Sequence, residues 1–291
     1  MTVIHSRLRD VSGSTQAGNV CPNRVRRTRR RIRRHVGLAL LLGLLGAVTT
    51  PASLAADPPT LYQQAVHILG GNGNVVSRWH DALRVAIVGL ASPEEAIGIV
   101  ASAAGLARLS YSVTKAPAGD AAAYNTLLQD TPAYALGADC AAKPSHGQCP
   151  NLVIIETDNP TMQALSTTIP MPGVHLQALR RDPDLECFFY AFRDGRLRIR
   201  QAVVYVRSGL SDAMRKTCLN EEIYQAFGMF GDYTNSVDFS FNNVVAPKAL
   251  TRFDQLLLQA LYDDRVKAGY PVHHVATVFL DYVRNAGLEV R

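Results

Sequence analysis

The sequence predicts an α+β domain, built on a mixed β-sheet that one helix covers and that C-terminal helices follow. Three observations indicate this class. A strand, a helix and a strand follow one another over residues 83–114, a strongly apolar strand is expected at 152–157, and a helix at 218–228 carries carboxylates beside apolar residues. A strand–helix–strand order suits a sheet with a helix packed on one face.

Residues 1–56 have the features of an export signal. Eight arginines lie between positions 24 and 34, an apolar run spans 36–48, and small residues follow at 51–56. The apolar run is shorter than the roughly 20 residues that cross a bilayer. We therefore expect a removed signal peptide, a single domain over 57–291, and a periplasmic or secreted location. Contact with the membrane is expected only if the leader stays uncleaved.

The charge of the chain depends on this leader. The whole sequence carries a net charge of +6, but residues 1–56 hold ten Arg and one Asp, a net +9, so the remainder carries −3. A basic chain would suggest nucleic acid as a partner. Because the basic residues belong to the leader, no nucleic-acid partner is expected.

Four cysteines follow the leader, at positions 140, 149, 187 and 218. An even number of cysteines in an exported chain indicates disulfides, and four allow three pairings. We favour Cys140–Cys149, which closes a short loop, and Cys187–Cys218, which ties a strand to the helix at 218–228. None of the spacings is Cys-x-x-Cys, so no cysteine zinc site is predicted.

The domain begins with a helix and a strand–helix–strand unit. Residues 61–69 are apolar enough for a helix, which stops at the glycine-rich stretch 70–73. Residues 83–89 alternate and then become continuously apolar, as a strand does when it becomes buried. Ser92 and Glu95 have capping-box spacing, with Pro93 at the first helical position, and so begin a helix. Residues 110–114 alternate as the next strand.

The middle of the domain is less regular. Residues 115–150 are rich in Ala, Gly, Pro and Asp and predict a loop insertion. Residues 152–157 form the strongest strand pattern in the chain, and 161–168 form a short helix or an irregular connection. Residues 187–192 and 199–206 predict a hairpin around the turn at Asp194-Gly195.

The C-terminal part is helical. Residues 236–243 read as a polar loop with embedded aromatic residues. Thr251 and Asp254 have the spacing of a capping box for a helix at 253–262. Pro271 opens a final amphipathic helix with apolar residues at three- and four-residue spacing.

The helix at 218–228 organises the rest of the chain. Asn220 is expected as its N-cap, Glu221 and Glu222 then occupy the first turn, where the helix dipole favours negative charge, and Gly228 ends it. Glu221 and Gln225 are four residues apart, so their side chains lie on the same face.

This spacing matches the zinc-protease helix His-Glu-x-x-His, in which two histidines bind zinc and the glutamate polarises a water. Glu222 stands in the place of the catalytic glutamate, while Glu221 and Gln225 replace the histidines. The longer metzincin motif continues to a glycine and a third histidine, often followed by Asp. Here those places hold Gly228, Gly231 and Asp232. The frame resembles a metzincin whose three metal ligands have become Glu, Gln and Gly.

Most of the chain after the leader resembles a family of exported bacterial proteins, the domain of unknown function 2927. The resemblance rests on the pattern Cys-x-x-Glu-Glu-x-x-Gln-x-x-Gly, which is met at every place from Cys218 to Gly228. Four further segments also resemble the family. These are Arg78-Trp79 with the following strand, residues 152–157, Ser240-Phe241-Asn242, and 250–265. One departure is Gly231-Asp232, where Asn-Asp is expected. The family has no established activity.

The likeness of this layout to metzincins implies a zincin-like (metzincin-like) fold. It also implies that 152–157 is an edge strand that binds substrate, and that Phe241 takes the place of the methionine beneath the metal. The side chains expected to line the cleft are Glu221, Glu222, Gln225, Asp232, Ser240 and Asn242. The simpler reading is that the two glutamates only complement the helix dipole, and that Ser240 and Asn242 form a turn.

The predicted function is that of a catalytically inactive, exported protein that binds a partner or supports the structure of the cell envelope. An extended peptide or an envelope protein would be the partner, with the peptide pairing to strand 152–157. No cofactor and no metal site are predicted. The alternative is a metal-dependent peptidase, in which zinc is held by atypical ligands and Glu222 is the general base.

Overall fold

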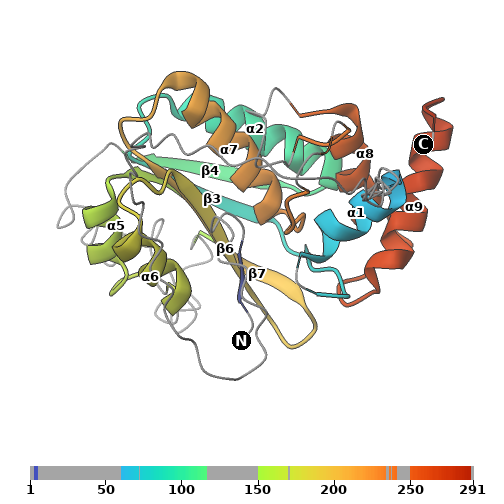
Figure 1. The fold of residues 1–291 in the computed structure, drawn as a ribbon, viewed down its shortest axis with the longest axis horizontal. Coiled ribbons are helices and arrows are strands. Elements are labelled where there is room, and N and C mark those ends of the chain that lie inside the picture. Colours follow the sequence, from blue (N-terminus) through green and yellow to red (C-terminus); the bar gives the residue numbers. More distant parts are fainter. Residues whose placement is uncertain are drawn as a thin grey trace, which may run out of the picture. The chain divides into compact units, whose positions relative to one another are not determined.

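A mixed sheet forms the centre of the fold in the computed structural model (Figure 1). The structure describes residues 3–5, 60–71, 73–116, 150–169, 171–233, 236, 238–240 and 250–289. Within these residues the sheet has seven strands in the order β1-β6-β7-β5-β3-β4, and β2 pairs with β7 off this path. The α+β class is therefore confirmed.

Most neighbouring strands of the sheet run parallel, and one hairpin runs antiparallel. β4, β3, β5 and β7 pair in parallel, β6 and β7 pair antiparallel, and β1 pairs antiparallel with β6. The strands are β1 Val3–His5, β2 Arg78–Trp79, β3 Leu83–Val88, β4 Tyr111–Ala116, β5 Leu152–Thr157, β6 Cys187–Arg193 and β7 Arg198–Arg207. The expected hairpin and the parallel strand–helix–strand unit are both present.

The predicted edge position of β5 is wrong. β5 lies between β3 and β7, pairs in parallel with both, and is buried along its whole length. Its backbone groups are therefore used on both sides, and no extended peptide can add there. Among the described strands, β4 is the edge strand at one end of the sheet. At the other end, β6 pairs with β1 over only three residues.

Helices cover both faces of the sheet (Figure 1). One core lies between the sheet and five helices, and the other lies between the sheet and two shorter helices. The first group is α1 Leu61–Gly70, α2 Pro93–Ala107, α7 Asp212–Ala226, α8 Arg252–Leu261 and α9 Val272–Asn285; the second is α5 Asn159–Leu165 and α6 Gly173–Arg181. Alternate side chains of β3, β5, β6 and β7 enter opposite cores, as the two-residue period of a strand requires.

Most helix boundaries follow local sequence signals. Thr251 and Asp254 form the predicted capping box at the start of α8. Ser92 precedes α2 as predicted, but its side chain makes no capping hydrogen bond. α6 was not predicted, although Pro172 at its N-cap and two arginines in its last turn mark its ends.

Several predictions fall wholly or partly outside the described residues. The Cys140–Cys149 pair, Phe241 and Asn242 lie there, as does most of the expected loop insertion at 115–150. Of that insertion, Lys115 and Ala116 belong to β4. Within the described part of the chain, no helix combines the length and the apolar character needed to cross a bilayer.

Candidate functional site

The candidate site lies on α7, which begins earlier than predicted. Ser211 is its N-cap, and the Ser211 hydroxyl accepts a hydrogen bond from the Met214 backbone N–H at 3.3 Å. Asn220, the predicted N-cap, lies inside the helix and donates to the Lys216 carbonyl oxygen at 3.0 Å. Because α7 is largely buried in its second half, it lacks the one-sided apolar pattern that would have indicated its start.

Glu221 and Glu222 therefore lie in the middle of a helix, not in a first turn. Their exposed fractions are 2% and 0%, and that of Gln225 is 0%. The prediction that the two glutamates are first-turn charges that complement the helix dipole is wrong, since they lie about three turns past Ser211 and are closed to solvent. Charged groups are seldom fully buried, and each of these three residues has an interaction partner.

The chain turns sharply after α7 and returns beside it. The Gln225 amide nitrogen donates to an Asp232 carboxylate oxygen, so these two predicted site residues do meet. Two glycines make the turn possible. Gly228 has φ +113°, and a Cβ there would lie 2.3 Å from the Ser77 carbonyl oxygen; at Gly231 a Cβ would lie 2.3 Å from the His67 carbonyl oxygen. Both glycines allow backbone segments to approach more closely than any side chain permits.

Two aromatic side chains satisfy the last carbonyls of α7. Trp79 Nε1 donates to the Ala226 carbonyl oxygen at 2.9 Å, and the Tyr262 hydroxyl donates to the Phe227 carbonyl oxygen at 2.9 Å. The Trp79 backbone N–H in turn donates to the Tyr262 hydroxyl at 3.0 Å. These contacts fix the C-terminal end of α7, where backbone carbonyls otherwise lack partners.

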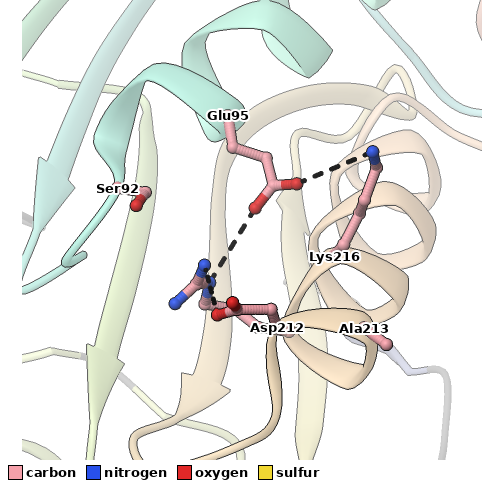
Figure 2. Close-up of a pocket in the computed structure, with 6 residues that line it drawn as sticks. Ser92, Glu95, Asp212, Ala213 and Lys216 are labelled. Carbon is pink, nitrogen blue, oxygen red and sulfur yellow. Dashed lines mark ion pairs between the residues drawn. The ribbon is translucent and has the colours of Figure 1, made fainter.

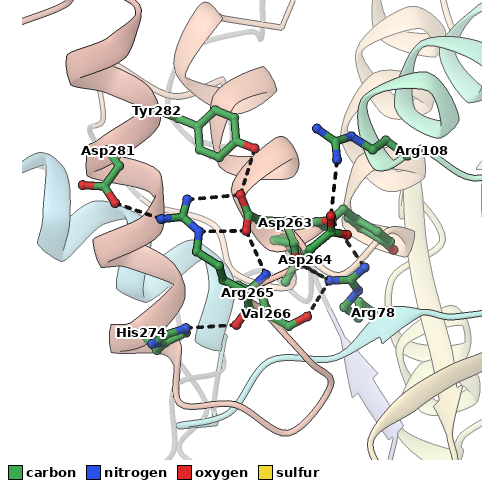
Figure 3. A network of polar contacts seen from close by, with 11 residues as sticks. Arg78, Arg108, Asp263, Asp264, Arg265, Val266, His274, Asp281 and Tyr282 are labelled. Carbon is green, nitrogen blue, oxygen red and sulfur yellow. Dashed lines mark hydrogen bonds and ion pairs between the residues drawn. The ribbon is translucent and has the colours of Figure 1, made fainter.

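An arginine secures the segment that carries Tyr262 (Figure 3). The Arg78 guanidinium donates to the carbonyl oxygens of Leu261, Asp263 and Val266 at 2.8–3.1 Å and lies 4.6 Å from the centre of the Tyr262 ring. Burial lowers the pKa of Arg78 from its ordinary value. Arg78 and Trp79 thus hold the end of α8 and the end of α7 together.

A polar network fixes the loop at 236–240, which contains Ser240. The Asp254 carboxylate accepts from the backbone N–H groups of Ser240 and Thr251 at 3.2 and 2.7 Å. Asp254 is fully buried, and burial raises its pKa to about 6. On the other side of the loop, the Ser236 hydroxyl donates to Gln64 of α1 at 2.6 Å. Ser240 is therefore held as part of a turn.

The disulfide Cys187–Cys218 is present, with both sulfurs buried, and confirms the predicted pairing. It joins the first residue of β6 to the middle of α7, one turn before Glu222. Further along, Phe189 of β6 stacks on Phe230 at 5.7 Å between ring centres. The helix face that carries the candidate residues is thus fastened to β6.

Two of the positions that correspond to metal ligands in the metzincin motif are constrained by their neighbours. The place of the third ligand is Gly231, where the backbone of α1 leaves no room for a side chain. Gln225 already donates its amide to Asp232. No group of three or more His, Cys, Asp or Glu residues within the described ranges is placed to hold a metal ion.

The structure brings together some of the predicted residues and adds others. Glu221, Glu222 and Gln225 share a buried stretch of α7 that Asp232 also contacts, while Ser240 belongs to the turn anchored by Asp254. The residues that fix this region were missed as site residues: Trp79, Tyr262, Asp254 and Gln64. Their common signal is a buried polar or amphipathic side chain beside a helix end, which a single sequence shows only weakly.

Comparison with known proteins gives one match. The sequence model of a family described as "Protein of unknown function (DUF2927)" matches residues 62–281. No curated protein and no solved structure matches the chain.

Proposed function

The chain belongs to the family described as "Protein of unknown function (DUF2927)", and from this premise we propose that it is an exported cell-envelope protein that binds an extended segment of a partner along β6. We propose further that the frame around α7 is zincin-like without being a zinc site. The observation that carries the proposal is the pairing of β1 with β6.

β1 indicates the kind of partner that fits. Val3, Ile4 and His5 pair antiparallel with Phe192, Ala191 and Tyr190, so β6 accepts a short extended segment through backbone hydrogen bonds. β1 lies within the predicted leader. If export removes residues 1–56, this side of β6 loses that strand, and the unpaired backbone groups of an edge strand accept another chain.

The position of α7 supports the zincin-like part of the proposal. α7 packs on β6 and β7, and the disulfide sets the stretch with Glu221, Glu222 and Gln225 alongside β6. The metzincin resemblance implies a similar arrangement. In it, the helix with the Glu-Glu-x-x-Gln motif lies beside a strand that pairs with an extended segment. The closed environment of the two glutamates favours binding over hydrolysis of the segment.

The experiment uses the protein purified after export, with its intact mass measured first. We expect a mass that lacks residues 1–56. A fluorescent peptide of residues 1–8 should then bind, whereas the same peptide methylated on the Ile4 backbone nitrogen should bind at least ten-fold more weakly, because it cannot pair. Equal affinity for both peptides, or retention of the leader, would overturn the proposal.

The peptidase alternative is tested on the same preparation. Elemental mass spectrometry should find no transition metal above background in protein purified without a chelator or a histidine tag. In the Glu222→Gln variant we expect peptide affinity to stay within two-fold of the original. About one metal ion per chain that is lost in Glu221→Ala, together with turnover that is lost in Glu222→Gln, would establish a metal-dependent peptidase instead.

A further inference from the structure

A pocket lies at the opposite end of α7 from the glycine turn (Figure 2). It has a volume of about 440 Å³ and lies between the first turns of α2 and α7. Its lining residues are Ser92, Glu95, Asp212, Ala213, Arg215 and Lys216. Arg215 precedes Glu222 by two helical turns, roughly 10 Å along the axis, so the pocket is distinct from the region next to β6.

The charges of this pocket are loosely paired. A Glu95 carboxylate oxygen lies 3.8 Å from Arg215 Nε, and the other lies 4.0 Å from Lys216 Nζ. Both distances exceed the range of a hydrogen bond to a charged nitrogen. Arg215 Nε is itself buried and has no hydrogen-bond partner within the described structure. The closest ion pair of Arg215 is with Asp212, at 3.1 Å, but the Asp212 side chain is 92% exposed.

We propose that this pocket binds the free carboxylate of a small acid or of a peptide C-terminus, between Arg215 and Lys216. The Glu95 carboxylate already lies near both Arg215 and Lys216, which shows that these two side chains attract a carboxylate. A guanidinium binds a carboxylate through two parallel hydrogen bonds, which Glu95 does not reach at its present distance. An incoming carboxylate therefore replaces Glu95 instead of joining it.

Two neighbouring side chains favour such a ligand. The Ser92 hydroxyl makes no capping hydrogen bond, so it remains able to donate to a group in the pocket. Ala213 occupies little of the space, which suits a ligand of a few non-hydrogen atoms beyond the carboxylate. The Glu156 carboxyl also interacts electrostatically with Arg215, and burial raises the pKa of Glu156.

The test is a calorimetric titration of the purified protein with N-acetyl-Ala-Ala and with succinate. The C-terminal amide of the dipeptide and inorganic phosphate are the comparison ligands. We expect Glu95→Gln to bind the carboxylates at least three-fold more tightly than the original protein, since its competitor is removed. Arg215→Gln should bind at least ten-fold more weakly. A preference for the dipeptide over succinate would identify peptide C-termini as the source.

A matched control exists one residue away from Glu95. Glu94 is 75% exposed, pairs with Lys115 on β4 and does not line the pocket, so Glu94→Gln should leave affinity unchanged. If Arg215→Gln fails to fold, Lys216→Ala at the exposed end of the pair provides the same comparison. The proposal is overturned if neither the original protein nor Glu95→Gln binds a carboxylate, if the amide binds equally well, or if phosphate is preferred.

Discussion

The side chain that Gly231 lacks would begin 2.3 Å from the carbonyl oxygen of His67. This contact is with backbone, which cannot move aside as a flexible side chain can. Gly231→Ala is therefore expected to destabilise the fold by about 1–3 kcal/mol, as overpacking does. Gly231→His, which would restore the third histidine of the metzincin motif, should be destabilised at least as much and should gain no zinc. Urea denaturation of each variant measures the effect.

The control for this prediction is Gly105→Ala. Gly105 lies within α2, and a Cβ there would meet nothing within 4 Å. Alanine is favoured over glycine in a helix, so this variant should gain about 0.5–1 kcal/mol. Similar losses in both variants would mean that close approach at Gly231 is not the cause.

Removing the Tyr262 hydroxyl, which contacts the end of α7, should have a large effect on stability. The Tyr262 hydroxyl both donates to the Phe227 carbonyl and accepts from the Trp79 backbone N–H. Tyr262→Phe leaves both buried groups without that partner, and we expect a loss of about 1–3 kcal/mol in the free energy of unfolding. In Tyr62→Phe, an exposed hydroxyl contact with His273 is removed, and stability should change by less than about 0.5 kcal/mol. Equal effects would contradict the assigned role of Tyr262.

The buried carboxyl of Asp254 should make stability depend on pH. Burial raises its pKa from 3.8 to about 6 in the folded state. Between these values the unfolded chain releases the proton while the folded protein keeps it, so this group's stabilising contribution is complete below pH 4 and is lost as the pH rises past 6. The free energy of unfolding of the original protein, minus that of Asp254→Asn, should therefore be larger at pH 4 than at pH 7.5, by on the order of 1–3 kcal/mol. A difference that is larger at pH 7.5 would show that the assigned direction is wrong.

The disulfide between β6 and α7 should contribute measurably to stability. Its two cysteines are 31 residues apart in sequence and are buried at 1% and 0% exposure. The double variant Cys187→Ala, Cys218→Ala should unfold with a free energy lower by about 2–4 kcal/mol. Reductant during denaturation should lower the stability of the original protein more than that of the double variant. Equal sensitivity would mean that this bond is not the one that stabilises the fold.

The sequence predicted where most helices and strands lie along the chain, but it predicted poorly which elements pack beside one another. The strand at 152–157 was correctly located, but its place in the sheet is a tertiary property that the metzincin likeness assigned wrongly. Its unbroken apolar run is in fact typical of a strand buried on both faces in a parallel sheet. The start of α7 was missed because its later turns are buried on several sides, although Ser211-Asp212 is a sound N-terminal signal.

The candidate site was predictable in its residues more than in its environment. Spacing alone placed Glu221 and Gln225 on one face of a helix, and cysteine pairing placed that helix next to a strand. Burial of Glu221 and Glu222 depends on how distant segments fold over α7. The contacts of Trp79 and Tyr262 with the helix end join residues 147 and 35 positions apart from their partners, beyond the reach of any local pattern.

The fastening of α7 to β6 by the disulfide, and to Trp79 and Tyr262 at its last turn, also determines how the molecule opens. Backbone amides in the second half of α7 should exchange with solvent deuterium only when the whole domain unfolds, because no smaller movement frees that helix from both attachments. β4 carries mostly exposed side chains and should exchange through local fraying. Between these extremes, strand β6 sends side chains into both cores, so its exchange should report on the integrity of the two layers at once.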